Sequence, residues 1–191
     1  MIAEEDVVLT ITHQGYNKRT ALNTYRTQRR GGRGVQGAMS KDEDFVEHLF
    51  IANTHNYMLF FTDMGKCYWL KVYDIPQGGR AARGRAIVNL IGCDPGERVE
   101  AFVSVKDFDE DHYIVMCTKN GIVKKTVLSA YGNPRKGGIY AIDIRDNDKL
   151  IEARITNGEH DILLGTHEGK SIRFSENNIR PSGRKTMGVK G

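Results

Sequence analysis

The 191-residue chain contains 28 Lys and Arg against 24 Asp and Glu, a net charge of +4, and 39% of its residues are hydrophobic. This length and composition are enough to bury a core, which excludes a disordered chain. Its three cysteines, Cys67, Cys93 and Cys117, are widely spaced and form no C-x-x-C pair, which argues against a disulfide framework or a zinc site. No long apolar run and no signal-peptide pattern is present, so we expect a soluble, cytoplasmic protein.

The predicted elements are short strands in a repeated order. A tetrapeptide Thr-x-x-Gly occurs four times, with its glycines 50, 56 and 48 residues apart, at residues 12–15, 62–65, 118–121 and 166–169. A run rich in β-branched and aromatic residues precedes each copy, at residues 7–11, 57–61, 113–117 and 162–165. A second run follows, most clearly at residues 67–72 and 122–128. Two such runs joined by a glycine turn predict a β-hairpin.

Further strand-like runs separate the hairpins, at residues 49–52, 86–90, 99–103, 138–142 and 150–155. Each repeat then holds about four strands, and a period near 50 residues predicts a propeller-like array of β-blades. Helix is scarce, and the one short helix expected begins where Ser40-Lys41-Asp42-Glu43 matches a capping box. The predicted fold class is all-β.

Charge is segregated along the repeat. Four windows run from each hairpin turn into the loop that follows it, at residues 15–34, 65–85, 119–137 and 169–190. They hold 22 of the 28 basic residues and only Asp74 and Glu176 among the acids, so they carry +20 while the other residues carry −16. Equivalent loops on equivalent blades would form a basic stripe, which suits a nucleic-acid backbone. No recognition helix or metal finger is visible, so phosphate contact and DNA bending are favoured over base reading.

The most basic segment is the heptapeptide Gln28-Arg29-Arg30-Gly31-Gly32-Arg33-Gly34, and no carboxylate lies between Gly15 and Gly34. Arginine matches phosphate oxygens, and glycine lets a backbone approach a ligand closely. Weaker counterparts end the other windows, at residues 79–84, 135–138 and 182–188. A solvated basic loop is the alternative for the heptapeptide alone, but its repetition favours a polyanion site.

Other motifs are set aside. Gly32-Arg33-Gly34-Val35-Gln36-Gly37 fits the dinucleotide pattern but lacks the strand before it and the helix after it. The acidic run at 107–111 begins like a calcium loop but lacks that loop's glycine and closing glutamate. Tyr68 and Trp69 are able to stack on bases, although aromatic side chains on a strand are more often core. We therefore predict no metal site and no catalytic constellation.

Together, the heptapeptide, the repeat and the charge pattern resemble the C-terminal domain of the A subunit of bacterial DNA gyrase. The heptapeptide matches that family's hallmark box, and the resemblance extends over Glu5-Asp6-Val7-Val8, Ala52-Asn53-Thr54-His55, and residues 83–90 and 120–126. It implies a β-pinwheel, a propeller-like disc of four-stranded blades that exchange strands with their neighbours. The resemblance further implies a family domain of about six blades, so we expect a single domain at residues 1–191 that is truncated or an open disc, with blades near 6–56, 57–111, 112–159 and 160–191.

The resemblance also implies a function. Duplex DNA would bend around the basic rim with positive writhe, so that the gyrase holoenzyme introduces negative supercoils. The implied partners are double-stranded DNA and, in an A2B2 holoenzyme, the remainder of the gyrase A and B subunits; no membrane partner is implied, and the isolated domain is expected to be monomeric. No cofactor and no catalytic residue is expected here, because ATP, Mg²⁺ and the catalytic tyrosine act elsewhere in the holoenzyme. The alternatives are the C-terminal domain of topoisomerase IV, whose box is usually degenerate, and a protein-binding β-propeller.

The predicted DNA-binding residues fall into two groups. The first is the box, Gln28, Arg29, Arg30, Gly31, Gly32, Arg33 and Gly34. The second comprises cations expected on the rim: Lys18, Arg19, Arg80, Arg83, Arg85, Lys124, Lys125, Arg135, Lys136, Arg173, Arg180, Arg184 and Lys185.

Overall fold

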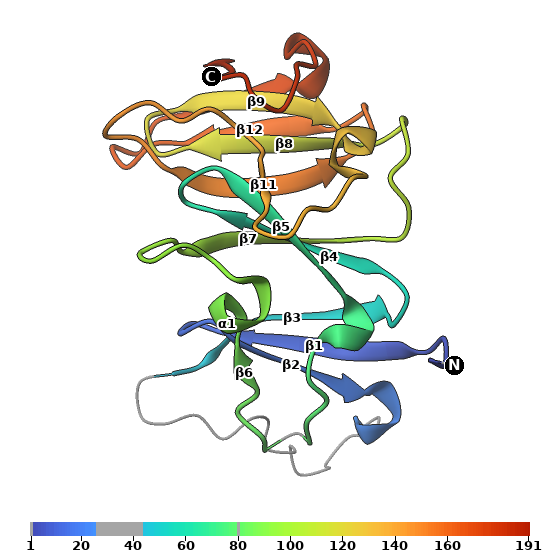
Figure 1. Cartoon of the computed structure of the whole chain (residues 1–191). Coiled ribbons are helices and arrows are strands. Elements are labelled where there is room, and N and C mark those ends of the chain that lie inside the picture. The colour runs from blue at the N-terminus through green and yellow to red at the C-terminus, as the bar shows by residue number, and fades with distance from the viewer. Residues whose placement is uncertain (1, 26–43, 80) are drawn as a thin grey trace, which may run out of the picture. The chain divides into compact units, whose positions relative to one another are not determined.

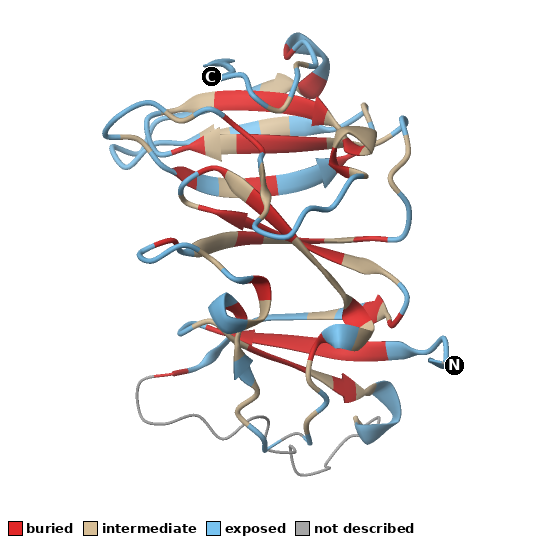
Figure 2. Cartoon of the chain, viewed as in Figure 1, coloured by how far each residue is buried: buried red, intermediate tan, exposed pale blue. Residues whose placement is uncertain are grey.

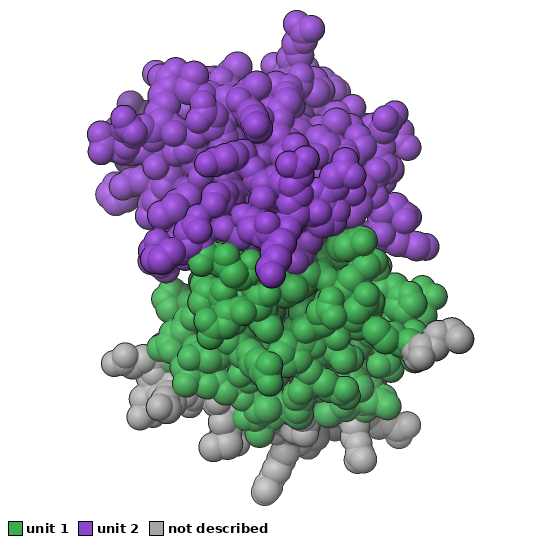
Figure 3. Space-filling model, in the orientation of Figure 1, with its two compact units in different colours: residues 1–58, 70–93 green, residues 59–69, 94–191 purple. Residues whose placement is uncertain are grey.

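The computed structural model describes residues 2–25, 44–79 and 81–191; residues 1, 26–43 and 80 lie outside that description (Figure 1). The chain divides into two compact units (Figure 3). Unit 1 comprises Met1–Met58 and Leu70–Cys93, and unit 2 comprises Leu59–Trp69 and Asp94–Gly191. The all-β prediction is confirmed, because strands dominate both units.

Three four-stranded sheets repeat one strand order, and a fourth sheet has two strands. The first sheet has the order β3 (Val46–Asn53), β1 (Asp6–Thr12), β2 (Tyr16–Ala21), β6 (Arg85–Ala86). The second has the order β7 (Val99–Val105), β4 (Tyr57–Thr62), β5 (Lys66–Lys71), β10 (Ile139–Tyr140). The third has the order β11 (Leu150–Thr156), β8 (Tyr113–Thr118), β9 (Ile122–Val127), β14 (Val189–Lys190). The fourth pairs β12 (Asp161–Gly165) with β13 (Ser171–Ser175).

Each four-stranded sheet thus has a hairpin at its centre, a long strand on one side and a two-residue strand on the other. The long strand follows the hairpin in sequence. The short strand comes later, after the next hairpin along the chain. In the first sheet, for example, β6 pairs with β2 through Asn17↔Arg85 and Tyr16↔Ala86. Consecutive repeats are therefore joined by backbone pairing as well as by the chain itself.

The Thr-x-x-Gly tetrapeptides form the four hairpin turns. In each turn the glycine N–H donates to the threonine carbonyl at 2.9 or 3.0 Å, and the glycine φ lies between +79° and +82°. The N–H of the residue after the glycine donates to the threonine Oγ1 at 3.1–3.3 Å. Glycine tolerates this left-handed conformation at little steric cost, and the threonine hydroxyl satisfies a turn donor. The repeated sequence therefore encodes one repeated turn.

A short 3-10 helix follows the second strand of every hairpin. These are η1 (Leu22–Thr24), η2 (Val72–Asp74), η3 (Leu128–Tyr131) and η4 (Glu176–Asn178). The short α-helix α1 (Ile87–Ile91) replaces most of the strand predicted at 86–90, which was wrong. Ile87 and Ile91 are both buried, because a four-residue spacing places them on one helical face, and Gly92 ends the helix at φ 65°. The strand predicted at 138–142 is reduced to β10, and the helix predicted from residue 40 begins outside the described residues.

The core of each unit lies along its hairpin strands, where Figure 2 shows the buried residues concentrated. In unit 1, six of the seven residues of β1 are buried. In unit 2, the rings of Phe60 and Phe102 and those of Phe61 and Tyr131 pack edge to face, each pair with centroids 5.8 Å apart. Tyr68 is also core, at 2% exposure. This packing holds the hairpins as rigid supports for the loops between them.

A glycine with positive φ stands immediately before each short strand, where the backbone crosses the edge of the hairpin. These are Gly84, Gly138 and Gly188, with φ of +88°, +76° and +94°. A Cβ would stand 2.3 Å from the Asn17 carbonyl oxygen at Gly84 and 2.5 Å from the Val123 carbonyl oxygen at Gly188. Only glycine allows so close a crossing.

We expect Gly188→Ala to lower the free energy of unfolding by about 1–3 kcal/mol, because it adds both a left-handed strain and a clash with backbone. Gly169→Ala is the matched control, since its φ is +79° but no atom lies within 4 Å of the new methyl group. Urea denaturation followed by circular dichroism measures both variants. Equal losses would show that the close crossing at Gly188 has no cost of its own.

Candidate nucleic-acid interface

Apart from residue 80, three glycine-containing basic loops lie within the described part of the chain, and each leads into one of the short strands. The first basic loop comprises residues 76–84, the second 132–138 and the third 180–188. The short strand after each loop pairs with the second strand of an earlier hairpin and so completes that hairpin's sheet. The pairs are β6 with β2, β10 with β5 and β14 with β9. The sequence repeat therefore places basic residues on loops whose ends are fixed by sheet pairing.

In unit 1, the first basic loop is held by β2. The Lys18 ammonium donates to the carbonyl oxygens of Gly79 at 2.8 Å and Ala82 at 2.7 Å. Thr20 Oγ1 donates to the Gly78 carbonyl at 3.0 Å and, just before the loop, Arg19 Nε donates to the Ile75 carbonyl at 2.7 Å. Side chains of β2 thus satisfy loop carbonyls that have no partner in a sheet ladder.

In unit 2, β9 likewise holds the third basic loop, although one of the two carbonyls that its lysine contacts lies outside the loop. The Lys124 ammonium donates to the carbonyl oxygens of Ala141 at 2.6 Å and Arg184 at 2.5 Å. The Ser182 N–H donates to the Lys125 carbonyl at 2.8 Å. The Arg184 guanidinium in turn donates to the Tyr140 carbonyl at 3.1 Å.

The second basic loop, also in unit 2, is fixed by aromatic residues. Tyr68 occupies the position on β5 that lysine occupies on β2 and β9, and its ring lies directly against Gly138. The Tyr68 hydroxyl donates at 2.7 Å to the buried carboxylate of Glu97, a residue outside the loop. The Trp69 indole N–H donates to the Tyr131 carbonyl, just before the loop begins, at 3.0 Å. Trp69 therefore helps to anchor this loop.

Three predicted rim cations lie inside the protein. Lys18, Lys124 and Lys125 are 2%, 0% and 3% exposed. Lys125 forms an ion pair with the buried Glu176 carboxylate at 3.1 Å. Burial acts to raise the pKa of Glu176, but hydrogen bonds from Thr156, from the His160 N–H and from Lys125 outweigh it and lower that pKa. In this structure the three lysine ammonium groups therefore make contacts within the protein, to loop carbonyls or to Glu176, and do not face solvent.

Other predicted cations are exposed or half-buried. Arg83 is half-buried, with its guanidinium 3.8 Å from the centre of the Tyr16 ring and a hydrogen bond to Gln14. Arg19 and Arg184 are also half-buried. Arg173 is exposed and ion-paired with Asp161. The remaining exposed members are Arg85, Arg135, Lys136, Arg180 and Lys185.

The box residues Gln28, Arg29, Arg30, Gly31, Gly32, Arg33 and Gly34, together with Arg80, lie outside the described residues. Sequence reasoning recognised the basic loops but not the lysines that hold them. A count of charges treats buried and exposed cations alike, because burial depends on loops that are distant in sequence. The one local signal is that Lys18 and Lys124 occupy hairpin strands and not loops.

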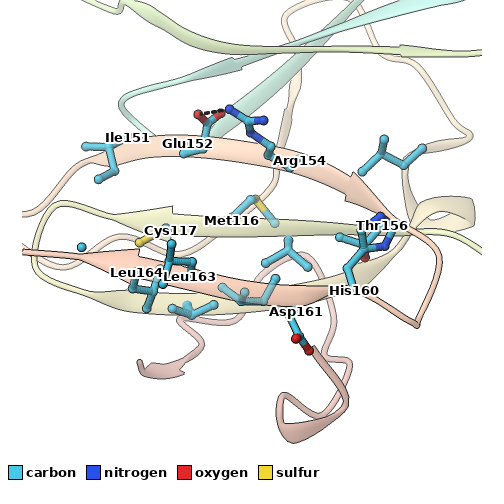
Figure 4. A pocket seen from close by; sticks show the side chains of 15 residues that line it. Met116, Cys117, Ile151, Glu152, Arg154, Thr156, His160, Asp161, Leu163 and Leu164 are labelled. Carbon is cyan, nitrogen blue, oxygen red and sulfur yellow. Dashed lines mark hydrogen bonds and ion pairs between the residues drawn. The ribbon is translucent and has the colours of Figure 1, made fainter. Parts of the chain in front are cut away.

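A separate apolar cavity of about 470 Å³ lies in unit 2 between β8, β11 and β12 (Figure 4). Its walls are mainly aliphatic, including Ile151, Leu163 and Leu164. Glu152 and Arg154, which also line it, are paired with each other at 3.3 Å. The cavity contains no nucleophile paired with a general base, so its chemistry does not suggest catalysis.

Among the described residues, no helix is long and apolar enough to cross a membrane, and no cluster of His, Cys, Asp and Glu is suited to a metal ion.

Comparison with known proteins matches this repeat to one family. The sequence profile of the DNA gyrase C-terminal domain, described as a beta-propeller, matches residues 6–53, 56–106, 112–157 and 160–191. The chain belongs to this family. The four matched segments correspond to the four Thr-x-x-Gly repeats, and the resemblance inferred from the sequence is confirmed.

Similar curated proteins are DNA gyrase A subunits. The chain is 52% identical over its full length to the gyrase A subunit of Clostridium acetobutylicum and 47% identical to that of Halalkalibacterium halodurans, and it covers 23% of each. Among solved structures, the C-terminal domain of DNA topoisomerase IV superposes with a TM-score of 0.84 at 32% identity, with 100% of this chain and 58% of that one covered. A DNA gyrase A C-terminal domain superposes with a TM-score of 0.74 at 25% identity, with 98% and 60% covered. The chain thus spans about a quarter of the curated relatives and about 60% of the solved domains.

The buried Lys124 gives this family member a measurable pH dependence. Burial, followed by the positive charge of Arg184, lowers the pKa of Lys124 from 10.5 to about 8, against a raising effect of Asp143. Between pH 8 and 10.5 the unfolded chain therefore holds a proton at this lysine that the folded chain has released, so stability increases with pH. We expect the free energy of unfolding of the wild type, measured relative to Lys124→Met, to be flat below pH 8 and to rise above it. Urea titrations at about pH 7, 8.5 and 9.5 test this; a flat difference across the range would contradict it.

Proposed function

We propose that the chain binds duplex DNA without sequence specificity and bends it along the basic loops. The observation that supports this most is the repetition: exposed or half-buried cations sit on loops whose backbones are fixed to successive hairpins. Fixed cations at repeated positions favour binding of a long polyanion over a small anion, because successive phosphates can each bind a cation that is already held in position. The absence of a recognition helix in the described residues favours phosphate contact as the mode of binding.

We further propose that this bending serves a gyrase-type enzyme. The curated relatives are named as the A subunit of DNA gyrase, and the chain covers 23% of their length. In that setting, a positively writhed DNA wrap would bias strand passage toward negative supercoils, with the remainder of the A and B subunits, ATP and Mg²⁺ supplying the chemistry. The proposed role of this chain is structural guidance of DNA, without a cofactor of its own.

The first test concerns the exposed cations of the second basic loop. Arg135 and Lys136 are both exposed and each should neutralise one phosphate. We expect Arg135→Ala with Lys136→Ala to weaken DNA binding equally for all sequences and to reduce the slope of log K against log salt by about 2. Fluorescence anisotropy across a salt series measures both quantities.

The matched control removes the same charge elsewhere. Lys106 and Lys149 are exposed and lie outside the basic loops. Lys106→Ala with Lys149→Ala should leave the salt slope unchanged. Equal changes in the two double variants would show that binding follows net charge and not the loops.

The second test concerns writhe and the box. Ligating a nicked circle in the presence of the protein should trap a positive change in linking number if the DNA is wrapped as proposed. Changing Arg29, Arg30 and Arg33 together to alanine should reduce this change more than it reduces binding, because the other basic loops still hold phosphates. An unchanged linking number with saturating wild-type protein would overturn the bending proposal, and parallel losses of binding and writhe would overturn the separate role of the box.

A further inference from the structure

Two buried lysines hold the first and third basic loops in a similar way. Both carbonyls that Lys18 holds lie in the first loop, whereas Lys124 holds one carbonyl of the third loop and that of Ala141, which follows β10. Lys18 and Lys124 are the third residues of β2 and β9, and both are at most 2% exposed. Each ammonium bridges two carbonyl oxygens, at 2.7 and 2.8 Å for Lys18 and at 2.5 and 2.6 Å for Lys124. The recurrence in separate units makes this an arrangement of the repeat.

The lysine stems cover the same crossing point. A Cβ on Gly84 would lie 3.2 Å from Lys18 Cβ, and one on Gly188 would lie 3.0 Å from Lys124 Cβ. The stem of each lysine therefore lies against the glycine where the loop crosses the hairpin, while its ammonium reaches into the loop. One side chain fixes the loop at two separate points.

At least one of the two carbonyls that each lysine holds belongs to a residue next to another cation of the loop. Ala82 precedes Arg83, and Arg184 precedes the exposed Lys185. Fixing the peptide unit before a side chain fixes the direction in which that side chain leaves the backbone. Each buried lysine thus sets the direction of a basic side chain that lies nearer the surface.

Burying an ammonium opposes folding unless hydrogen bonds replace its water shell. For both lysines burial lowers the pKa, which is the expected sign of that cost. A methionine of similar length would avoid the charge but would remove the charged donor from both carbonyl oxygens; of these, the Gly79 carbonyl would keep the Ala82 N–H as a donor. The buried lysines are therefore better explained by their ordering of the loops than by a gain in folding stability.

We propose that Lys18 and Lys124 are positioning residues that order the first and third basic loops for DNA without contacting a phosphate. This rests on the proposed function for its DNA readout, but the ordering itself is independent of DNA. The second basic loop is the internal comparison, because Tyr68 takes the lysine position there and directs its hydroxyl to Glu97.

The test uses Lys124→Met and, as a matched control in the same loop, Lys185→Met. Hydrogen exchange measured by mass spectrometry should show amides of residues 182–190 exchanging about tenfold faster in Lys124→Met, the size expected for losing a hydrogen bond to a charged group. Peptides from β8 and from the second basic loop should be unchanged. Lys185→Met should leave exchange unchanged throughout.

Salt titrations of DNA binding then separate positioning from contact. Lys124→Met should weaken binding while keeping the salt slope of the wild type, whereas Lys185→Met should reduce the slope by about 0.9. A reduced slope with unchanged exchange in Lys124→Met would mean a direct phosphate contact and would overturn the proposal. Faster exchange in β8 as well as in the loop would also overturn it, because Lys124 would then be a general core residue.

Two further outcomes are separable. If the wild type binds no DNA, the proposed function fails while the exchange experiment still decides whether the lysine orders the loop. If Lys124→Met does not fold, Lys18→Met provides the same test on the first basic loop in the other unit, read from the exchange of residues 78–86. Unchanged exchange in a folded lysine variant overturns the proposal.

Discussion

The free edge of each hairpin is the constraint on which the arrangement of the basic loops depends. The second strand of a hairpin exposes backbone donors and acceptors, and in three sheets a two-residue strand from the next repeat covers them. So short a strand forms few hydrogen bonds, which is why a glycine crossing and buried side chains accompany it in each case. Because that strand follows directly on the basic loop, covering the edge also sets where the loop's charges lie.

The repeat and the hairpins could be predicted because their signals are local. Threonine and glycine three residues apart determine the turn through contacts within five residues, and flanking β-branched runs supply the strands. The error at α1 has the opposite origin. Ile87-Val88-Asn89-Leu90 has the composition of a strand, but burial of Ile87 and Ile91 on one side favours a helix there. Tertiary packing outweighed a short segment's preference.

Whether an individual basic side chain is buried or exposed could not be predicted from the charge of the sequence windows. Counting treats Lys124 and Lys185 as equivalent members of a basic stretch, yet one is buried and the other exposed. What distinguishes them is a loop some 60 residues away that closes over β9. The same holds for Lys125, whose partner Glu176 lies in a later repeat. The effective charge presented to a ligand is therefore smaller and more localised than the +20 of the windows suggests.

The short strands β6, β10 and β14, which one repeat supplies to the sheet of the repeat before it, also affect how such a chain gains or loses repeats. The unit that recurs in sequence runs from one hairpin to the next, whereas the unit that is complete in hydrogen bonds takes its last strand from the following repeat. Duplicating or deleting a sequence repeat therefore preserves every sheet only if the new neighbour supplies an equivalent short strand with its crossing glycine. Evolutionary change in repeat number is thereby tied to the interfaces between repeats, and the basic loops, which lie at those interfaces, are inherited with them.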